Sequence, residues 1–202
     1  MRIMSTTWQG MRAALILVVV ALSGACSWQS APVHFYVLGG ARGSPVTTPA
    51  PPERGPTVGV GPITLPRYLE RNNIVTRQDT ELVVAEYDRW AEPLSEGVPR
   101  LIAGDLSTLL GTERIVMFPW PVGKTVDQQV VVEVLRFEGT SGGDVVLEAR
   151  WRILGPEKQE VLLRHSIVRE PDGGAGYPAL VAAMSRSVGM LSREIADAVK
   201  RT

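Results

Sequence analysis

The chain has one cysteine and two histidines in 202 residues. A single cysteine cannot form a disulfide within the chain, so a folded domain must be held together by packing. Metal sites of the zinc type need several such donors close together, so we expect no metal and no cofactor. The 21 basic and 21 acidic residues cancel, which leaves no overall field to attract nucleic acid or anionic lipid.

Catalytic signatures are also missing. The sequence has no Gly-x-Ser-x-Gly elbow and no phosphate-binding loop. His34 and His165 both fall in strand patterns, and His165 shares its alternating side with Val161, Leu163 and Ile167. This pattern predicts a hydrogen-bonded histidine in the core rather than a catalytic one. We therefore expect that the protein is not an enzyme.

The N-terminal segment has the parts of a secretory signal. Arg2 and Arg12 precede an apolar run over residues 13–22, and small residues then lead to Cys26. The run is roughly half the length of a membrane-spanning helix, which takes about 20 residues. Its ending resembles a bacterial lipobox, although Ser23 holds the place of the usual leucine. We predict a lipoprotein signal peptide over residues 1–25 and lipid attachment at Cys26; the alternative is an ordinary signal peptide that leaves Cys26 unmodified.

The residues after the cysteine indicate where the protein is held. Ser27 is not the aspartate of an inner-membrane retention signal, so we expect anchoring at the periplasmic face of the outer membrane. Several acyl chains would make that anchor stable. Residues 26–32 form a short lipidated tether, whose part after the cysteine reaches about 20 Å when fully extended. The folded domain is therefore expected close to its membrane.

Residues 33–202 are predicted to form a single periplasmic α+β domain, with a mostly antiparallel sheet and two helices packed on one face. Residues 39–56 are rich in glycine and proline and predict a flexible loop, and residues 63–77 an irregular arm. One helix should begin at a Ser95 cap and end before Gly111, and another should cover residues 177–199. Strands are expected at residues 33–38, 57–62, 81–87, 113–118, 128–137, 145–154 and 161–168.

The arm and the turn before the first helix contain candidate binding residues. Apolar groups in a segment without a core pattern, and an arginine beside a tryptophan, are typical of binding surfaces. The alternative is structural, in which the arm wraps the sheet edge, the tryptophan fills a gap under the first helix, and Arg89 pairs with Glu92. The candidate partner-contact residues are Leu65, Pro66, Tyr68, Leu69, Arg89 and Trp90.

The same stretches resemble the ABC-type transport auxiliary lipoproteins, in particular the PqiC-like (paraquat-inducible protein C) group. The resemblance rests on the order of the elements, on Leu65-Pro66, Tyr68-Leu69 and Arg77, and on the run from Arg89 to Leu94. Members work beside an inner-membrane protein that carries MCE (mammalian cell entry) domains, in systems thought to move lipids between the two membranes. The resemblance therefore implies a non-catalytic auxiliary subunit that supports envelope integrity.

Other functions fit the residues as well. One is an outer-membrane assembly or envelope-structural lipoprotein, and another is a periplasmic carrier that binds lipid between sheet and helices. The partners expected are the MCE-domain protein and the outer membrane, the latter through the N-terminal lipid. A homo-oligomer is possible, and nucleic acid is not expected as a partner.

Overall fold

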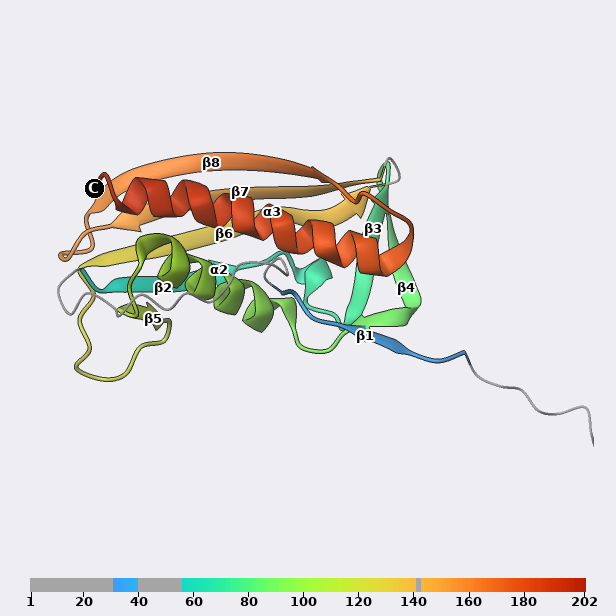
Figure 1. Ribbon diagram of the computed structural model, residues 1–202, viewed down its shortest axis with the longest axis horizontal. Helices are drawn as coiled ribbons and strands as arrows, with labels where there is room; N and C mark the ends of the chain where they lie inside the picture. Colours follow the sequence, from blue (N-terminus) through green and yellow to red (C-terminus); the bar gives the residue numbers. More distant parts are fainter. Residues whose placement is uncertain (1–30, 40–55, 141–142) are drawn as a thin grey trace, which may run out of the picture. The chain divides into compact units, whose positions relative to one another are not determined.

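Within residues 31–39, 56–140 and 143–202, a mixed sheet of eight strands is organised around β6 (Gln128–Thr140), as Figure 1 shows. Along one edge β6 pairs antiparallel with β7 (Asp144–Leu154), and β7 pairs antiparallel with β8 (Glu160–Pro171). These three strands correspond to the strands predicted at residues 128–137, 145–154 and 161–168. They are long because β-branched and other apolar residues recur along them with a period of two.

The other edge of β6 pairs with two strands in succession. β2 (Val58–Thr64) runs parallel to the first half of β6, and β3 (Asn73–Gln78) runs parallel to its end. β5 (Ile115–Met117) extends the sheet beyond β2 in parallel. β4 (Glu81–Trp90) pairs antiparallel with β3, and β1 (His34–Tyr36) pairs parallel with β4.

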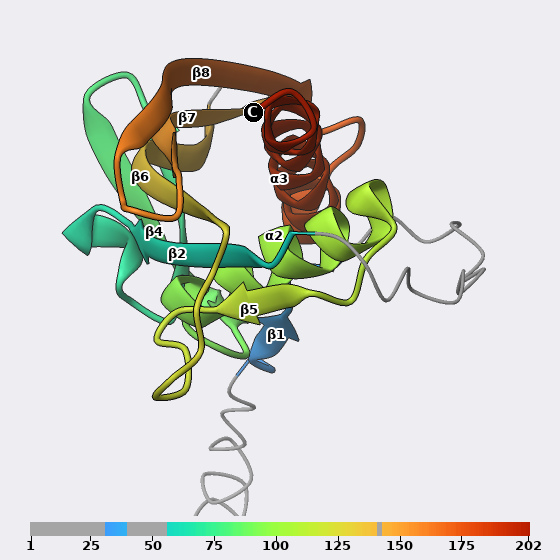
Figure 2. The ribbon, with the colours of Figure 1, turned by 90° about the vertical axis from the view of Figure 1, so that its left-hand side faces the viewer.

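Two helices lie side by side on one face of this sheet (Figure 2). α3 (Gly176–Val199) packs on β6, β7 and β8, and α2 (Leu94–Leu110) packs on β2 and β5. α2 ends at Gly111, whose φ of 64° is left-handed and whose N–H binds the carbonyl of Ser107. Its N-cap is Pro93, which has no side-chain cap, so the predicted Ser95 cap is wrong.

The structure is a computed structural model, and it describes residues 31–39, 56–140 and 143–202. Residues 33–202 form one unit, and residues 1–32 belong to another. The predicted signal peptide, Cys26, most of the tether and most of the predicted loop 39–56 lie outside the described residues. In the part that is described, no helix has the length and apolarity needed to cross a bilayer.

The predicted α+β fold, with a mostly antiparallel sheet and two helices on one face, is confirmed, and part of the sheet is parallel. Two of the parallel pairs join β2 and β3 to the same edge of β6, and the other two join β5 to β2 and β1 to β4. β3 begins within the predicted irregular arm 63–77, so that prediction is wrong for residues 73–77. The polar residues Asn73, Thr76, Arg77 and Gln78 hide the period-two pattern by which this strand could have been recognised.

The side of β8 that the sequence predicts to face the core is instead exposed to solvent. Val161, Leu163 and Ile167 are 45%, 60% and 55% exposed, and the side chain of His165 lies 2.9 Å from Glu148 at the surface. β8 takes its facing from β7, whose helix-facing residues pair with the other set of β8 side chains. His165 is therefore a surface residue rather than a core histidine.

Candidate functional site

β6 changes the facing of its side chains at a bulge. Val134 lies opposite Ala149 and Arg136 lies opposite Glu148, so Leu135 is one extra residue in β6. One extra residue sends every later side chain to the other face of the sheet. Even-numbered residues of β6 therefore face the helices before the bulge, and odd-numbered residues face them after it.

Beyond the bulge, Glu138 points away from the helices. Its neighbour Phe137 pairs with Leu147 on the helix-facing side, and Gly139 lies so close to α3 that an added Cβ would be 2.4 Å from Leu180. With uninterrupted alternation, Glu138 would share the apolar side of Val134, where a carboxylate finds no partner. The bulge sends this carboxylate to the opposite face instead.

The arm covers Glu138 on that opposite face. β2 pairs with β6 as far as Glu133, and β3 pairs with it again from Gly139. The connection between β2 and β3 contains the 3-10 turn η1 (Arg67–Leu69), which brings Tyr68 to Glu138. Glu138 is thereby fully buried.

The carboxylate of Glu138 accepts four hydrogen bonds. Its Oε1 accepts from Arg77 Nε and Arg136 Nε, each at 2.6 Å. Its Oε2 accepts from the Tyr68 hydroxyl at 2.5 Å and from the Phe137 N–H at 3.1 Å. The Arg77 guanidinium also lies 5.9 Å from the centre of the Tyr68 ring. A buried charge needs this degree of pairing. Three of the four donors are long side chains, and the fourth is the backbone N–H of Phe137.

The electrostatics agree with this geometry. Burial alone would raise the pKa of Glu138, but the hydrogen bonds from Arg77, Tyr68 and Arg136 outweigh it and hold the pKa below its ordinary value. Burial, and then the hydrogen bond to Glu138, raise the pKa of Tyr68 to about 12. At neutral pH the site therefore holds an ionised carboxylate, a neutral phenol and two arginines.

We call this set (Tyr68, Arg77, Arg136 and Glu138) the Glu138 cluster. Tyr68 and Arg77 belong to the motifs noted in the sequence, and the structure brings them together. The sequence pattern does not identify Glu138 and Arg136 as site residues, because the strand that it predicts, 128–137, ends one residue before Glu138. A charged pair inside an apolar strand was the signal that could have identified them.

Five of the six candidate partner-contact residues fall into two groups. Leu69 and Trp90 are 3% and 4% exposed and lie in the core, so their side chains pack within the domain. Leu65, Pro66 and Tyr68 are partly exposed along the arm. They form the surface of the arm that a partner could reach.

Arg89 lies apart from the arm surface. It is exposed on β4, in register with Phe35 of β1. The pairing with Glu92 that the structural alternative included is not the one observed, because Glu92 pairs with Arg100. Arg89 therefore belongs to the β1 edge of the sheet.

A groove of about 560 Å³ lies between α2 and α3. Its walls combine Leu101 and Met190 with Arg100, Asp105 and Arg193. A carrier for acyl chains would be expected to enclose an apolar cavity, whereas this groove is open and carries charged side chains. Over residues 31–39, 56–140 and 143–202, no group of three His, Cys, Asp or Glu side chains is placed to hold a metal ion.

Tyr68→Phe is expected to lower the free energy of unfolding by about 1.5–3 kcal/mol, because it removes a hydrogen bond to a buried charged acceptor. Chemical denaturation of the two proteins measures the difference. Tyr177→Phe is the matched control, since this partly buried side chain makes no hydrogen bond with the described residues, and it should change stability by less than about 0.5 kcal/mol. Equal losses in both variants would contradict a special role for the Tyr68 hydroxyl.

Comparison with known proteins identifies the family that this chain matches. Residues 36–196 match the family model described as the ABC-type transport auxiliary lipoprotein component. The intermembrane transport lipoproteins PqiC of Escherichia coli (strain K12) and of Shigella flexneri are each 26% identical to this chain over 140 residues, which cover 69% of this chain and 72% of theirs.

Two solved structures share the fold. An uncharacterised protein aligns with a TM-score of 0.68 at 22% identity, covering 83% of this chain and 99% of its own. A protein from Xanthomonas campestris aligns with a TM-score of 0.66 at 19% identity, covering 81% and 93%. At these identities the likeness shows the fold alone.

Proposed function

Because the chain belongs to the family of ABC-type transport auxiliary lipoprotein components, we propose that it is an outer-membrane-anchored, periplasmic subunit of an MCE-containing system that transports lipids between the two membranes. Its role there is non-catalytic. The observation that carries the proposal is the family match over residues 36–196, which spans nearly all of the folded unit 33–202. The relatives named as intermembrane transport lipoproteins support the same assignment.

The anchor in this proposal is a lipid on Cys26. The folded unit begins at Val33, seven residues further along the chain. A subunit held so close to the outer membrane must be reached by a partner that spans the periplasm. The family resemblance points to an inner-membrane protein with MCE domains as that partner.

The docking surface proposed for this partner is the exposed side of the arm, at Leu65, Pro66 and Tyr68. A docking surface binds best when it is already ordered, because less conformational entropy is lost on binding. The Glu138 cluster supplies that order, since it joins Tyr68 to β3 and β6. Leu69 and Trp90 contribute from beneath, through the core.

Photocrosslinking tests the proposal without disturbing the fold. Arg67 is exposed in the middle of the arm, so a photoreactive amino acid placed there should form a crosslink to an MCE-domain protein when cells are irradiated. Mass spectrometry of the crosslinked band identifies the partner.

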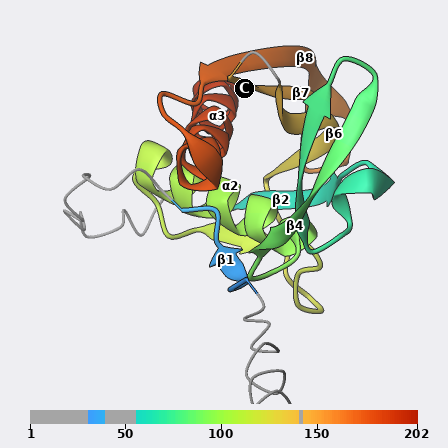
Figure 3. The same ribbon diagram turned by 90° about the vertical axis from the view of Figure 1, so that its right-hand side faces the viewer.

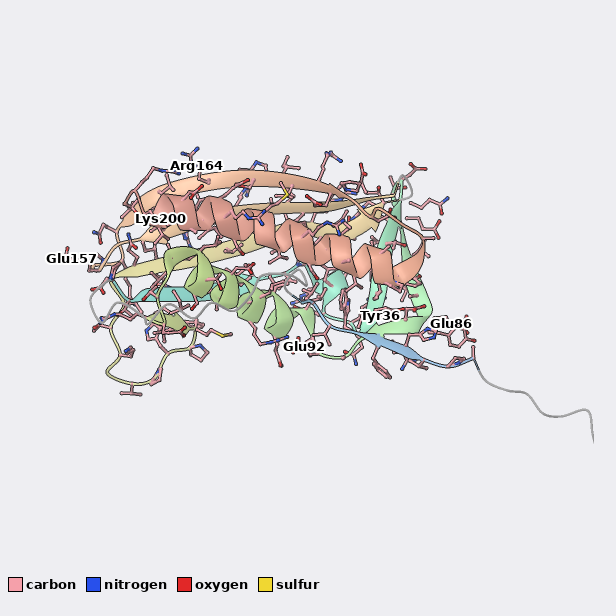
Figure 4. All side chains as sticks on the ribbon, viewed as in Figure 1. Tyr36, Glu86, Glu92, Glu157, Arg164 and Lys200 are labelled. Atoms are coloured by element: carbon pink, nitrogen blue, oxygen red, sulfur yellow. The ribbon has the colours of Figure 1, made fainter. Side chains whose placement is uncertain are left out.

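The matched control for this experiment is position 157. Glu157 is also exposed, and it lies at the end of the folded unit opposite to the labelled Tyr36 (Figure 4). Crosslinks of equal strength at positions 67 and 157 would remove the arm from the proposal. An envelope barrel protein captured from position 67, in place of an MCE-domain protein, would favour the assembly-lipoprotein function.

A further inference from the structure

The outer side of β1 exposes apolar side chains to solvent. Val33, Phe35 and Val37 alternate along the strand and its flanks and are 39%, 65% and 50% exposed. Tyr87, on the neighbouring strand β4, is 39% exposed. We call these four residues the β1 face. An exposed cluster that contains aromatic residues marks an interaction surface more often than a scattered apolar residue does.

The opposite side of β1 is bound firmly to the domain. The Tyr36 hydroxyl donates to Asp88 Oδ1 at 2.8 Å, and His34 Nδ1 lies 3.3 Å from the same oxygen. The Ala91 N–H donates to the Tyr36 carbonyl at 2.8 Å, and Leu38 is buried in the core. These contacts fix which side of β1 faces outward, so the exposure of Phe35 follows from the fold.

β1 is an edge strand. Among the described residues it pairs with β4 alone, and Figure 3 shows the two strands together at the border of the sheet. Arg89 of β4 lies in register with Phe35 and is also exposed. An arginine beside an aromatic ring suits the boundary between phosphate groups and acyl chains, where each group finds its preferred surroundings.

The chain itself limits how far this face can move from the membrane. Val33 lies seven positions after Cys26, and a fully extended chain between their two Cα atoms spans about 25 Å at most. Among the strands in the described part of the chain, β1 is the first after the cysteine, so it is kept closer to the lipid attachment point along the chain than the others.

We infer that the β1 face rests on the lipid bilayer that holds the acyl chains of Cys26, with Phe35 at the boundary between headgroups and acyl chains. This inference rests on the proposed lipid modification of Cys26. The lipid would then do more than tether the domain: together with the β1 face it gives the domain two points of attachment and therefore one orientation. The exposed residues of β8 carry no such argument, because nothing in the chain holds them near the membrane.

Lipid-borne quenchers test this inference on the full acylated protein. Cys26 is the only cysteine, so once it is acylated an introduced cysteine is the only free thiol that a fluorophore can label. The protein carrying Phe35→Cys is labelled and reconstituted in vesicles of phosphatidylethanolamine and phosphatidylglycerol that contain nitroxide lipids. We expect quenching at position 35 several-fold stronger than at a labelled Leu163→Cys, which is 60% exposed on β8.

The outcomes separate this inference from the function proposed above. Mass spectrometry before labelling shows whether the acyl groups are present, and their absence would refute the anchor itself. In acylated protein, equal quenching at positions 35 and 163 would overturn the membrane contact. A blue shift at position 35 that grows with protein density, without quenching by lipid, would assign the β1 face to a second copy of the chain and overturn the inference as well.

Discussion

Glu138→Ala is expected to lower the free energy of unfolding by about 3–5 kcal/mol, the usual loss when one partner is removed from a buried charge pair. The variant leaves Arg77 and Arg136 facing each other without the carboxylate that both bind. It also leaves the Tyr68 hydroxyl without its acceptor. Since the two arginine side chains remain 25% and 29% exposed, water compensates part of the loss, and we expect a value near the lower end of the range.

Chemical denaturation measures this loss, with Glu133→Ala as the matched control. Glu133 lies on the same strand with an exposed side chain, so its removal should cost less than about 0.5 kcal/mol. Losses of similar size in the two variants would show that the Glu138 cluster contributes nothing beyond an ordinary surface carboxylate.

The pH dependence of the stability difference between wild type and Glu138→Ala gives a further check on the role of the Glu138 carboxylate. The pKa of Glu138 is lowered in the folded protein, so the carboxylate contributes its stability above the unfolded pKa, about 4.3 for glutamate. That stability is lost as the pH falls through the lower folded value. The difference between wild type and Glu138→Ala should therefore be constant near neutral pH and shrink in acid.

Cys26→Ser is expected to abolish acylation and to release the protein from the membrane fraction, or to leave it unprocessed. The thiol is the only group in the chain to which the predicted lipid can be attached. Without acyl chains the apolar surface of the folded unit must hold the protein by itself, and a few exposed side chains bind a bilayer only weakly. Metabolic labelling with a fatty-acid probe, followed by membrane fractionation, measures both effects.

Ser27→Asp is the companion variant, because it leaves the cysteine intact. It should keep full labelling while moving the protein from outer-membrane to inner-membrane fractions. Equal fatty-acid labelling of wild type and Cys26→Ser would refute lipid attachment at this residue, and the ordinary signal peptide would then explain the N-terminal segment.

Local periodicity was sufficient for the long elements. The stripe that predicts a helix over residues 177–199 is the buried side of α3, including Met184, Leu191 and Ile195. The alternation along β7 likewise predicts its helix-facing side, where Ala149 and Trp151 are buried. In both cases one face of the element is buried, and the spacing of the apolar residues in the sequence shows which face it is.

Neighbouring strands decided what periodicity could not. β8 has apolar residues on both sides, so its own pattern does not reveal which side is buried; pairing with β7 makes that choice. The strand β3 is polar enough to read as irregular, and it becomes a strand because β4 and β6 offer it hydrogen-bonding partners. Propensity is a weak guide where the ladder itself supplies the stability.

For the candidate site, too, part could be predicted from the sequence and part was decided by the tertiary structure. The sequence by itself predicts lipid attachment at Cys26, distinguishes the arm from segments with a core pattern, and contains the motifs that indicate the family. Only the tertiary structure showed that Leu69 and Trp90 are core residues and that Tyr68 is bound to a buried carboxylate. The reason lies in the bulge at Leu135: one extra residue reverses the facing of Glu138, and only the pairing of β6 with β7 reveals that the extra residue is there.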